Sequence, residues 1–257
     1  MVSRRDAARS VPIVGLVRRV AGRKIMGPAG YQRWRGLLFM HWPVPLQALR
    51  PLVPSALALD SFAGQAYISL IPFVIAESRP ASAPAALATR FLETNLRTYV
   101  RAPDGEPGIY FFSLEASSLL AVAAARLLFG LPYFPAAMST RREGSSIDYV
   151  SRRRGARDTV VEVTWSVDGA TAPAAPGTRD HFLIERYSLY VTRRTGLYRG
   201  RVRHPPYPLH RAVVRRLRQT VVRAAGLPEP TQPPFCHCSP GVDVDIFWLE
   251  RIATSPG

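Results

Sequence analysis

Residues 91–100, FLETNLRTYV, show the clearest alternation of apolar and polar positions along the chain. One set of alternate positions carries leucine, threonine and valine, whereas the other carries aromatic, acidic, amide and basic side chains. Because neighbouring side chains of a β-strand point to opposite faces, this pattern predicts a strand with one largely apolar face and one polar, aromatic face. Turn residues between 103 and 108 precede the apolar stretch IYFFSLEAS, so residues 91–117 are predicted to form an antiparallel hairpin.

Further strands are predicted where apolar or alternating stretches are bounded by turn residues. They cover residues 34–42, 65–75, 145–151, 159–167, 182–192, 196–203 and 240–250. Residues 76–90 are rich in Ala, Ser and Pro without a periodic pattern, and we expect a loop there.

Helices are predicted in three places, at residues 46–53, 118–130 and 208–225. The second has the Ala and Leu content of a buried helix, with Ser117 or Ser118 as its N-cap and Gly130 as its end. The third has an apolar stripe beside many arginines and is predicted to be a basic amphipathic helix. Since strands outnumber helices and the connections are short, an antiparallel, strongly curved or closed sheet is favoured over a doubly wound one.

The chain has 257 residues and a formal net charge of +16, which would suit nucleic acid or another anionic partner. Lys24 is its only lysine, so we interpret the excess of arginine as a consequence of codon usage. The basic stretches are accompanied by no nucleic-acid-binding motif and by no interleaving of basic and aromatic residues. No specific nucleic-acid partner is therefore expected, and a basic nucleic-acid-associated protein is the least favoured alternative.

Cys236 and Cys238 are the only cysteines, which excludes a disulfide framework and indicates a reducing, cytoplasmic location. Together with His237 they could form a zinc-binding site, because thiolates and imidazole bind zinc. On a strand, however, His237 would oppose the two thiols, and the cysteines of structural zinc sites are usually separated by two or more residues. We therefore expect neither a metal nor a cofactor.

Residues 1–30 are predicted to form a basic, partly ordered leader, and residues 31–257 a single β-rich domain. The apolar run of the leader, at 11–17, is short for the core of a signal peptide. No run approaches the roughly 20 apolar residues that cross a bilayer, so no membrane span is expected.

Residues 125–134, ARLLFGLPYF, resemble a segment of acetoacetate decarboxylase in which an arginine, a glycine and a proline precede two adjacent lysines. Arg126, Gly130 and Pro132 match that segment, but Tyr133 and Phe134 fall on its two lysines. Schiff-base decarboxylation needs an amine nucleophile, and a phenol and a phenyl ring cannot form an iminium. The resemblance therefore does not imply acetoacetate decarboxylation.

The wider pattern is similar to the YqjF-like uncharacterised family, a branch of the acetoacetate decarboxylase-like superfamily, over roughly residues 34–248. It is carried by the motifs LLFMHWPVP, LRPLVPSALALDSFAGQAYISLIPF, FLETNLRTYV, IYFFSLEAS, ARLLFGLPYF, FLIERYSLY and SPGVDV. The resemblance implies an α+β, mainly antiparallel β fold: a cone-shaped or strongly curved barrel with a few flanking helices and an interior site. It leaves both a monomer and a homo-oligomer open, and it does not imply the activity.

The polar face of residues 91–100 is the candidate site if it points inward. Arg97 then offers a fork for a carboxylate, Asn95 an amide donor and acceptor, and Glu93 a general base, with Tyr99 beside them. By resemblance, Glu93 also sits near the position of a site glutamate in the decarboxylases. The alternative is that this face meets solvent, with Glu93 and Arg97 as an exterior ion pair.

Arg126 and Tyr133 complete the candidate site. Arg126 lies on an apolar helix, and a buried arginine needs partners, so it is expected to meet Glu93, Glu115 or a bound anion, or else to cap nearby carbonyls. Tyr133 either orients a substrate carbonyl or fills space.

The predicted function is the binding of a small carboxylate or carbonyl compound in an interior cavity. Arg97, Arg126, Asn95 and Tyr99 are expected to hold this ligand. If the protein is an enzyme, Glu93 and Tyr133 are expected to perform acid–base chemistry without a Schiff-base lysine. The alternative is a non-catalytic binding module, which needs the arginines but not Glu93.

Overall fold

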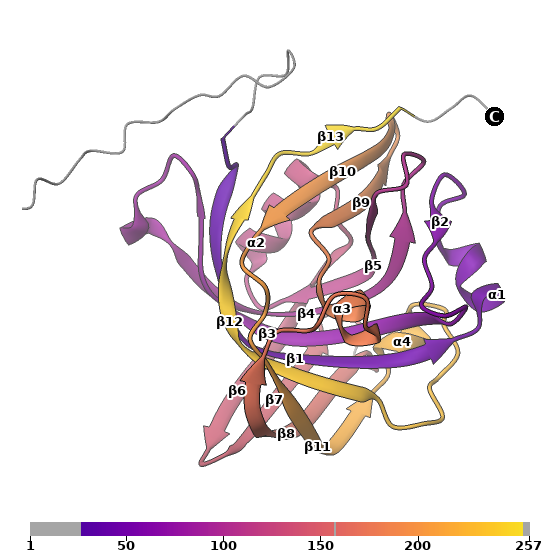
Figure 1. Ribbon diagram of the computed structural model, residues 1–257. Coiled ribbons are helices and arrows are strands. Elements are labelled where there is room, and N and C mark those ends of the chain that lie inside the picture. Colours follow the sequence, from indigo (N-terminus) through magenta and orange to yellow (C-terminus); the bar gives the residue numbers. More distant parts are fainter. Residues whose placement is uncertain (1–26, 157, 254–257) are drawn as a thin grey trace, which may run out of the picture.

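The computed structural model describes residues 27–156 and 158–253, and within them thirteen strands form one sheet (Figure 1). The strands are β1 (Gly30–Val44), β2 (Ala58–Leu59), β3 (Ala66–Pro80), β4 (Thr89–Arg101), β5 (Pro107–Ala116), β6 (Tyr133–Glu143), β7 (Ser146–Arg153), β8 (Val160–Ala172), β9 (Ser188–Arg193), β10 (Gly196–Arg203), β11 (Leu209–Gln219), β12 (Phe235–Ile246) and β13 (Glu250–Arg251). The helical segments are α1 (Leu46–Leu49), η1 (Arg50–Leu52), η2 (Ala85–Leu87), α2 (Leu119–Ala124), η3 (Ala125–Phe129), α3 (Arg179–Ile184) and α4 (Val221–Ala224).

The sheet closes on itself. Its strands run in the order β13-β10-β9-β5-β6-β7-β8-β11-β12-β1-β3-β4-β2, and β4 also pairs with β5 and β10 with β12. The pairings are antiparallel except for β5 with β6 and β5 with β9. Figure 1 shows β6, β7, β8 and β11 as a layer on one side of β1, β3 and β4, with β9 and β10 on the other. The expected strongly curved, mainly antiparallel barrel is confirmed.

The central strands β1, β3 and β4 are buried on both faces. One set of alternate residues, including Phe39 and Phe73, joins a core with β5, α3 and β12. The other set, including Met40, Leu70 and Leu96, joins a second core with β7, β8 and β11. The alternation of residues 91–100 therefore separates two interiors rather than an interior from solvent.

The strand predictions hold for most of the sheet. The hairpin is formed by β4 and β5, with a register that runs from Glu93↔Ala116 to Arg101↔Pro107. Residues 76–90 are a shorter loop than expected, because Ser78 pairs with Thr89 and extends both flanking strands. Strand β6 was not predicted, since small and polar residues occupy most of its positions and give no apolar alternation.

The predicted basic helix at 208–225 is wrong. Residues 209–219 form β11, which pairs with β8 from Leu209↔Ala172 to Gln219↔Val161, and only the short α4 follows. Ala212, Val214 and Leu217 pack on the second core. The apolar residues of 208–225 as a whole fit a helical stripe as well as a strand, but pairing with β8 turns Val214 inward and leaves Val213 41% exposed.

The predicted strand at 182–192 is half wrong. Its first residues end α3, which begins after Thr178, whose hydroxyl accepts a hydrogen bond from the backbone N–H of His181 over 3.2 Å. Strand β9 starts only at Ser188.

The predicted helix at 118–130 exists as α2 and the π-helical turn η3, capped by Ser118 and ended by the left-handed Gly130. It is not buried: the exposed fractions of Leu119, Leu120 and Leu127 are 60%, 71% and 81%. Within the described part of the chain, no helix is long and apolar enough to cross a membrane. The predicted leader lies almost entirely outside the described residues, as does Lys24.

Candidate functional site

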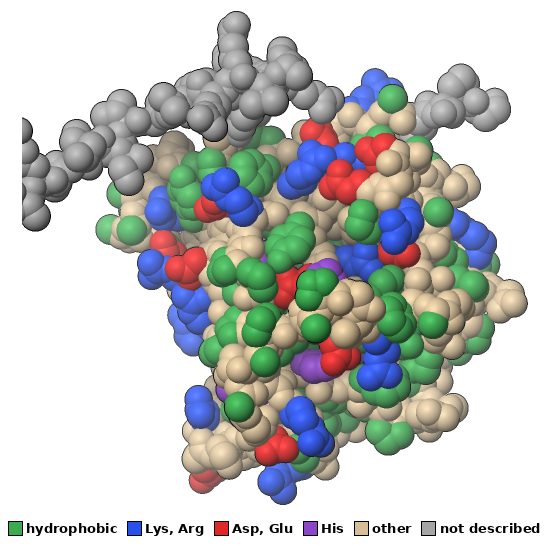
Figure 2. Space-filling view, viewed as in Figure 1, with side chains coloured by type: hydrophobic (Ala, Val, Ile, Leu, Met, Phe, Trp, Pro, Cys, Tyr) green, Lys and Arg blue, Asp and Glu red, His purple; other side chains and the backbone are tan. Residues whose placement is uncertain are grey.

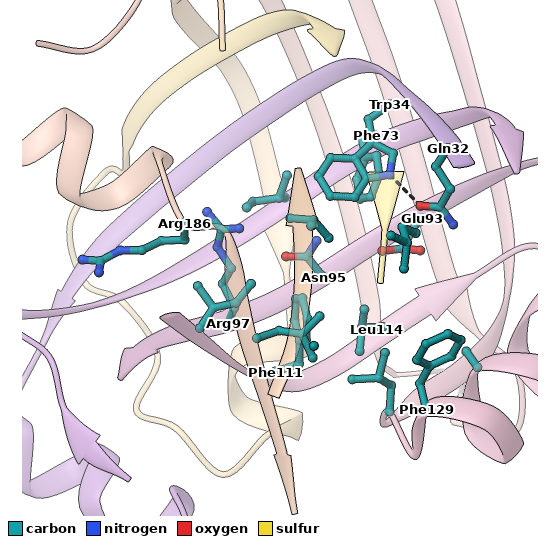
Figure 3. Close-up of a pocket in the computed structure, with 18 of the residues that line it drawn as sticks. Gln32, Trp34, Phe73, Glu93, Asn95, Arg97, Phe111, Leu114, Phe129 and Arg186 are labelled. Carbon is teal, nitrogen blue, oxygen red and sulfur yellow. Dashed lines mark hydrogen bonds between the residues drawn. The ribbon is translucent and has the colours of Figure 1, made fainter. Parts of the chain in front are cut away.

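A cavity of about 240 Å³ lies on the inner face of β1, β3, β4 and β5 (Figure 3). Most of its wall is aromatic or aliphatic and includes Trp34, Phe73, Phe111 and Leu114. Helix α2 and turn η3 cover part of it with the alanines of their inner side and with Phe129. A mostly apolar cavity with a few convergent polar groups is typical of a small-molecule site.

Strand β4 supplies the central polar groups of the cavity. Glu93, Asn95 and Arg97 occupy alternate positions, point to the same side and are only 4%, 6% and 7% exposed. In Figure 3, Asn95 lies between Glu93, which is near Gln32, and Arg97, which is near Arg186. The alternative of a solvent-facing Glu93–Arg97 ion pair is therefore wrong: the face points inward, and no ion pair joins the two residues.

The Glu93 end of the cavity contains a paired carboxyl and phenol. Tyr133 donates a hydrogen bond from its hydroxyl to Oε2 of Glu93 over 2.7 Å, and Tyr149 donates to the Glu93 carbonyl over 2.7 Å. Burial raises the pKa of Glu93 to about 7, with a further rise from Glu115, while the bond from Tyr133 lowers it. A carboxyl group that titrates near neutrality can both accept and return a proton.

Glu115, the acidic neighbour that raises the pKa of Glu93, has an arginine as its ion-pair partner. Arg153 binds it through a buried ion pair and lies 3.8 Å from the centre of the Phe134 ring. Burial raises the pKa of Glu115, and Arg153 opposes this rise. Arg153 thus has the role that the sequence suggested for Arg126.

The Arg97 end of the cavity contains two guanidinium groups in different situations. Arg186 is paired with Asp60, with 3.0 Å between Nη1 and Oδ2. Arg97 donates from Nη2 to the carbonyl of Leu183 over 3.1 Å, while its buried Nε has no hydrogen-bond partner among the described residues. No carboxylate among the described residues forms an ion pair with Arg97.

Tyr99 and Arg126 do not reach the cavity wall. Tyr99 is fully buried and donates a hydrogen bond to the Leu183 carbonyl over 2.7 Å, so it holds the same carbonyl that Arg97 contacts. Arg126 is exposed and donates from Nε to the carbonyl of Tyr133 over 2.7 Å. Its expected burial is wrong, because the outer side of α2 and η3 meets solvent, and it acts as the carbonyl cap that was the alternative.

Three further residues line the cavity but were not predicted as site residues from the sequence: Arg186, Gln32 and Trp34. Arg186 lies in the motif FLIERYSLY, but its position inside a supposed strand concealed that it follows α3. Gln32 accepts a hydrogen bond from the indole of Trp34 over 2.7 Å and carried no sequence signal of its own.

The FCHCSP segment lies on β12. Cys236 and Cys238 pack in the second core, while His237 faces Asp180, with 3.3 Å between Nε2 and Oδ2. Among residues 27–156 and 158–253, no cluster of three or more His, Cys, Asp or Glu side chains is arranged to hold a metal ion.

Basic side chains do not form a continuous patch on the face in Figure 2, where acidic and hydrophobic groups lie between them. On β11 and β7, Arg152, Arg216 and Arg218 all pair with Glu162. Part of the basic surface is thus neutralised within the protein.

Sequence comparison relates the chain to a family without an assigned function. The model of the DUF2071 family, described as "Uncharacterized conserved protein", matches residues 31–243. The "Uncharacterized protein YqjF" of Bacillus subtilis (strain 168) is 42% identical over 221 residues, which are 86% of this chain and 90% of that protein.

Solved structures with a similar fold include the enduracididine biosynthesis enzyme MppR complexed with pyruvate. It has a TM-score of 0.64 and 12% identity, and the match covers 91% of this chain and 95% of that one. The acetoacetate decarboxylase of Legionella pneumophila has a TM-score of 0.63 and 12% identity, with 96% and 99% covered. At this identity the likeness establishes the acetoacetate decarboxylase-like fold and nothing beyond it.

Proposed function

Since this chain belongs to the DUF2071 family and has an acetoacetate decarboxylase-like fold, we propose that its cavity binds a small organic carboxylate or carbonyl compound and acts on it by acid–base chemistry. The observation that carries the proposal is the presence, in one apolar cavity, of the Arg97 guanidinium, which has no acidic partner among the described residues, and of the Glu93 carboxyl group with a pKa of about 7. The first binds a carboxylate and the second transfers a proton.

Arg97 is suited to an anionic ligand because a buried charge is costly unless it is paired. The neighbouring Arg186 already has Asp60, whereas the Nε of Arg97 and the Oδ1 of Asn95 have no partners among the described residues. A ligand carboxylate would accept from the guanidinium in the strong, charge-assisted geometry. Asn95, with its acceptor and donors in the cavity wall, would orient the rest of the ligand.

Glu93 is suited to proton transfer at a carbon next to a carbonyl. Tyr133 holds Oε2, and Oε1 is the oxygen left to face a ligand. Burial raises the pKa of Tyr133 well above its usual value, and Glu93 raises it further, so its hydroxyl stays a neutral donor. On transfer, the C–H proton goes to Glu93 and the electron pair moves onto the carbonyl oxygen.

The proposal involves no imine. Tyr133 and Phe134 occupy the positions that match the lysines of acetoacetate decarboxylase, and the only lysine of the chain is Lys24. The structure of MppR with pyruvate supports the class of ligand, because pyruvate is a small carboxylate with a carbonyl.

The test is calorimetric binding and turnover of small keto acids by three variants. Arg97→Ala should lose ligand affinity, whereas Glu93→Gln should keep the affinity and lose turnover by about 10²–10⁴-fold. Arg142→Ala removes an exposed arginine at the end of β6 and is the matched control. Full turnover by Glu93→Gln would contradict the acid–base role and leave a binding module.

A further inference from the structure

We infer that the ligand is an elongated, amphipathic keto acid, with its carboxylate at Arg97, an apolar body against Phe111 and Leu114, and its carbonyl next to Glu93. This inference rests on the proposed function and specifies its substrate. It differs from a pyruvate-like or acetoacetate-like ligand, in which the two functional groups are one or two bonds apart.

The first support is the separation of the two polar ends. Glu93 and Arg97 are four residues apart on an extended strand, so their Cα atoms are about 13 Å apart. Figure 3 shows Asn95 between them and the Arg97 guanidinium directed toward Arg186, away from Glu93.

The second support is the apolar character of the space between the two ends. Ile71 and Leu114, which pair with Asn95 from β3 and β5, line this space together with Phe73 and Phe111, and Asn95 is its central polar group. A short keto acid bound to Arg97 would leave these apolar side chains in contact with water and would not reach Glu93. A hydrocarbon segment would cover the wall and span the distance.

The third support is the cavity volume. About 240 Å³ corresponds to about eight waters at their share of liquid volume, roughly 30 Å³ each. It is also just below the roughly 300 Å³ at which pockets for drug-sized ligands begin. The space is therefore sufficient for an acid with several methylenes or one ring.

The reaction that Glu93 could perform follows from the position of the ligand carbonyl, which lies several bonds from the carboxylate. A carbonyl several bonds from the carboxylate cannot promote loss of that carboxylate as carbon dioxide. Glu93 would instead take a proton from the carbon next to the distal carbonyl, give an enolate, and return the proton to the same carbon. No co-reactant is required, and the hydrogen at this carbon exchanges with solvent when the protonated Glu93 carboxyl trades its proton with water before it returns one.

The experiment is calorimetric titration of the whole protein with straight-chain methyl-ketone acids, starting at pyruvate and lengthened by one methylene at a time. Each added methylene should tighten binding about threefold to fourfold until the cavity is filled. Deuterium exchange next to the ketone, followed by NMR, should appear only in the longer acids and should be lost in Glu93→Gln.

Two variants, Ala124→Leu and Arg97→Ala, separate a failure of the elongated-ligand inference from a failure of the proposed function. Ala124→Leu adds bulk from the partly exposed α2 to the cavity wall, so it should shift the optimum to shorter acids without unfolding the protein. If pyruvate binds as tightly as the longer acids and Arg97→Ala abolishes this binding, the elongated ligand is wrong while the proposed function stands. If no acid binds, or if Arg97→Ala binds all of them like the wild type, the proposed function itself fails.

Discussion

The Tyr133 hydroxyl donates a hydrogen bond to Oε2 of Glu93 over 2.7 Å, within a cavity where the two residues are only 9% and 4% exposed. Opposing effects act on this carboxyl group. Burial raises its pKa, the hydrogen bond favours the carboxylate and lowers it, and the nearby Glu115 raises it further. The balance, near pH 7, makes the pair responsive to any change in either residue.

Tyr133→Phe should raise the pKa of Glu93 above about 7, because it removes the donor that stabilises the carboxylate. The titration of isotopically labelled glutamate, followed by NMR, measures this shift. Tyr187→Phe is the matched control, since Tyr187 also lines the cavity but donates to Glu185. A midpoint that falls in Tyr133→Phe would contradict the assigned direction.

Glu93→Gln should stabilise the protein at pH 8 and have little effect on stability below about pH 4.5. The folded pKa of about 7 lies above the ordinary value of 4.5, so the folded state holds its proton longer than the unfolded state. The wild type therefore loses stability as the pH rises from about 4.5 through 7, and the variant does not. The loss amounts to about 3 kcal/mol.

Urea unfolding of the wild type and Glu93→Gln at several pH values measures this difference. If the stability of the variant relative to the wild type is lower at pH 8 than at pH 5, folding favours the carboxylate form of Glu93 and lowers its pKa, which contradicts the assigned direction.

Arg153→Ala should destabilise the protein by about 3–5 kcal/mol, because it leaves Glu115 buried without its cation. Chemical denaturation measures the loss. Arg142→Ala, at an exposed position of β6, should stay within about 0.5 kcal/mol of the wild type. Equal effects of the two variants would mean that the Arg153–Glu115 pair is solvated.

Gly241→Ala should be more destabilising than any other glycine substitution tested in the sheet. Gly241 has φ +129°, and a Cβ there would lie 1.9 Å from the Trp34 carbonyl oxygen, so β1 and β12 would have to separate. Gly144→Ala is the control: φ is +58° and nothing lies within 4 Å of the added carbon. We expect about 1 kcal/mol for Gly144→Ala and more than about 3 kcal/mol for Gly241→Ala. Similar melting temperatures would contradict the close approach.

The sequence located the central strand of the site but not the direction of its polar face. Alternation placed Glu93, Asn95 and Arg97 on one side, and that grouping is correct. The choice of side was open because β4 is buried on both faces, a consequence of the sheet closing on itself that no local pattern contains.

The wrong predictions have one physical origin: each depends on how distant segments of the chain pack together, which a local sequence pattern does not contain. At 208–225 the apolar spacing fits a helix and a bulged strand alike, and pairing with β8, some 50 residues away, selects the strand. Arg126 was expected to be buried because its neighbours are apolar, yet leucines of α2 and η3 are exposed to solvent. Arg186 was missed because its role depends on the distant Asp60.

The central claim is that Arg97 binds a ligand carboxylate inside the cavity. The most direct measurement is a thermal-shift comparison of the wild type, Arg97→Ala and Arg142→Ala against a panel of keto acids and matched methyl esters. A ligand at about a hundred times its dissociation constant should add about 2.7 kcal/mol, a shift of several degrees. The account predicts this shift for the free acids with the wild type and Arg142→Ala, and its loss with the esters or in Arg97→Ala. Equal shifts from acids and esters, or an undiminished shift in Arg97→Ala, would contradict it.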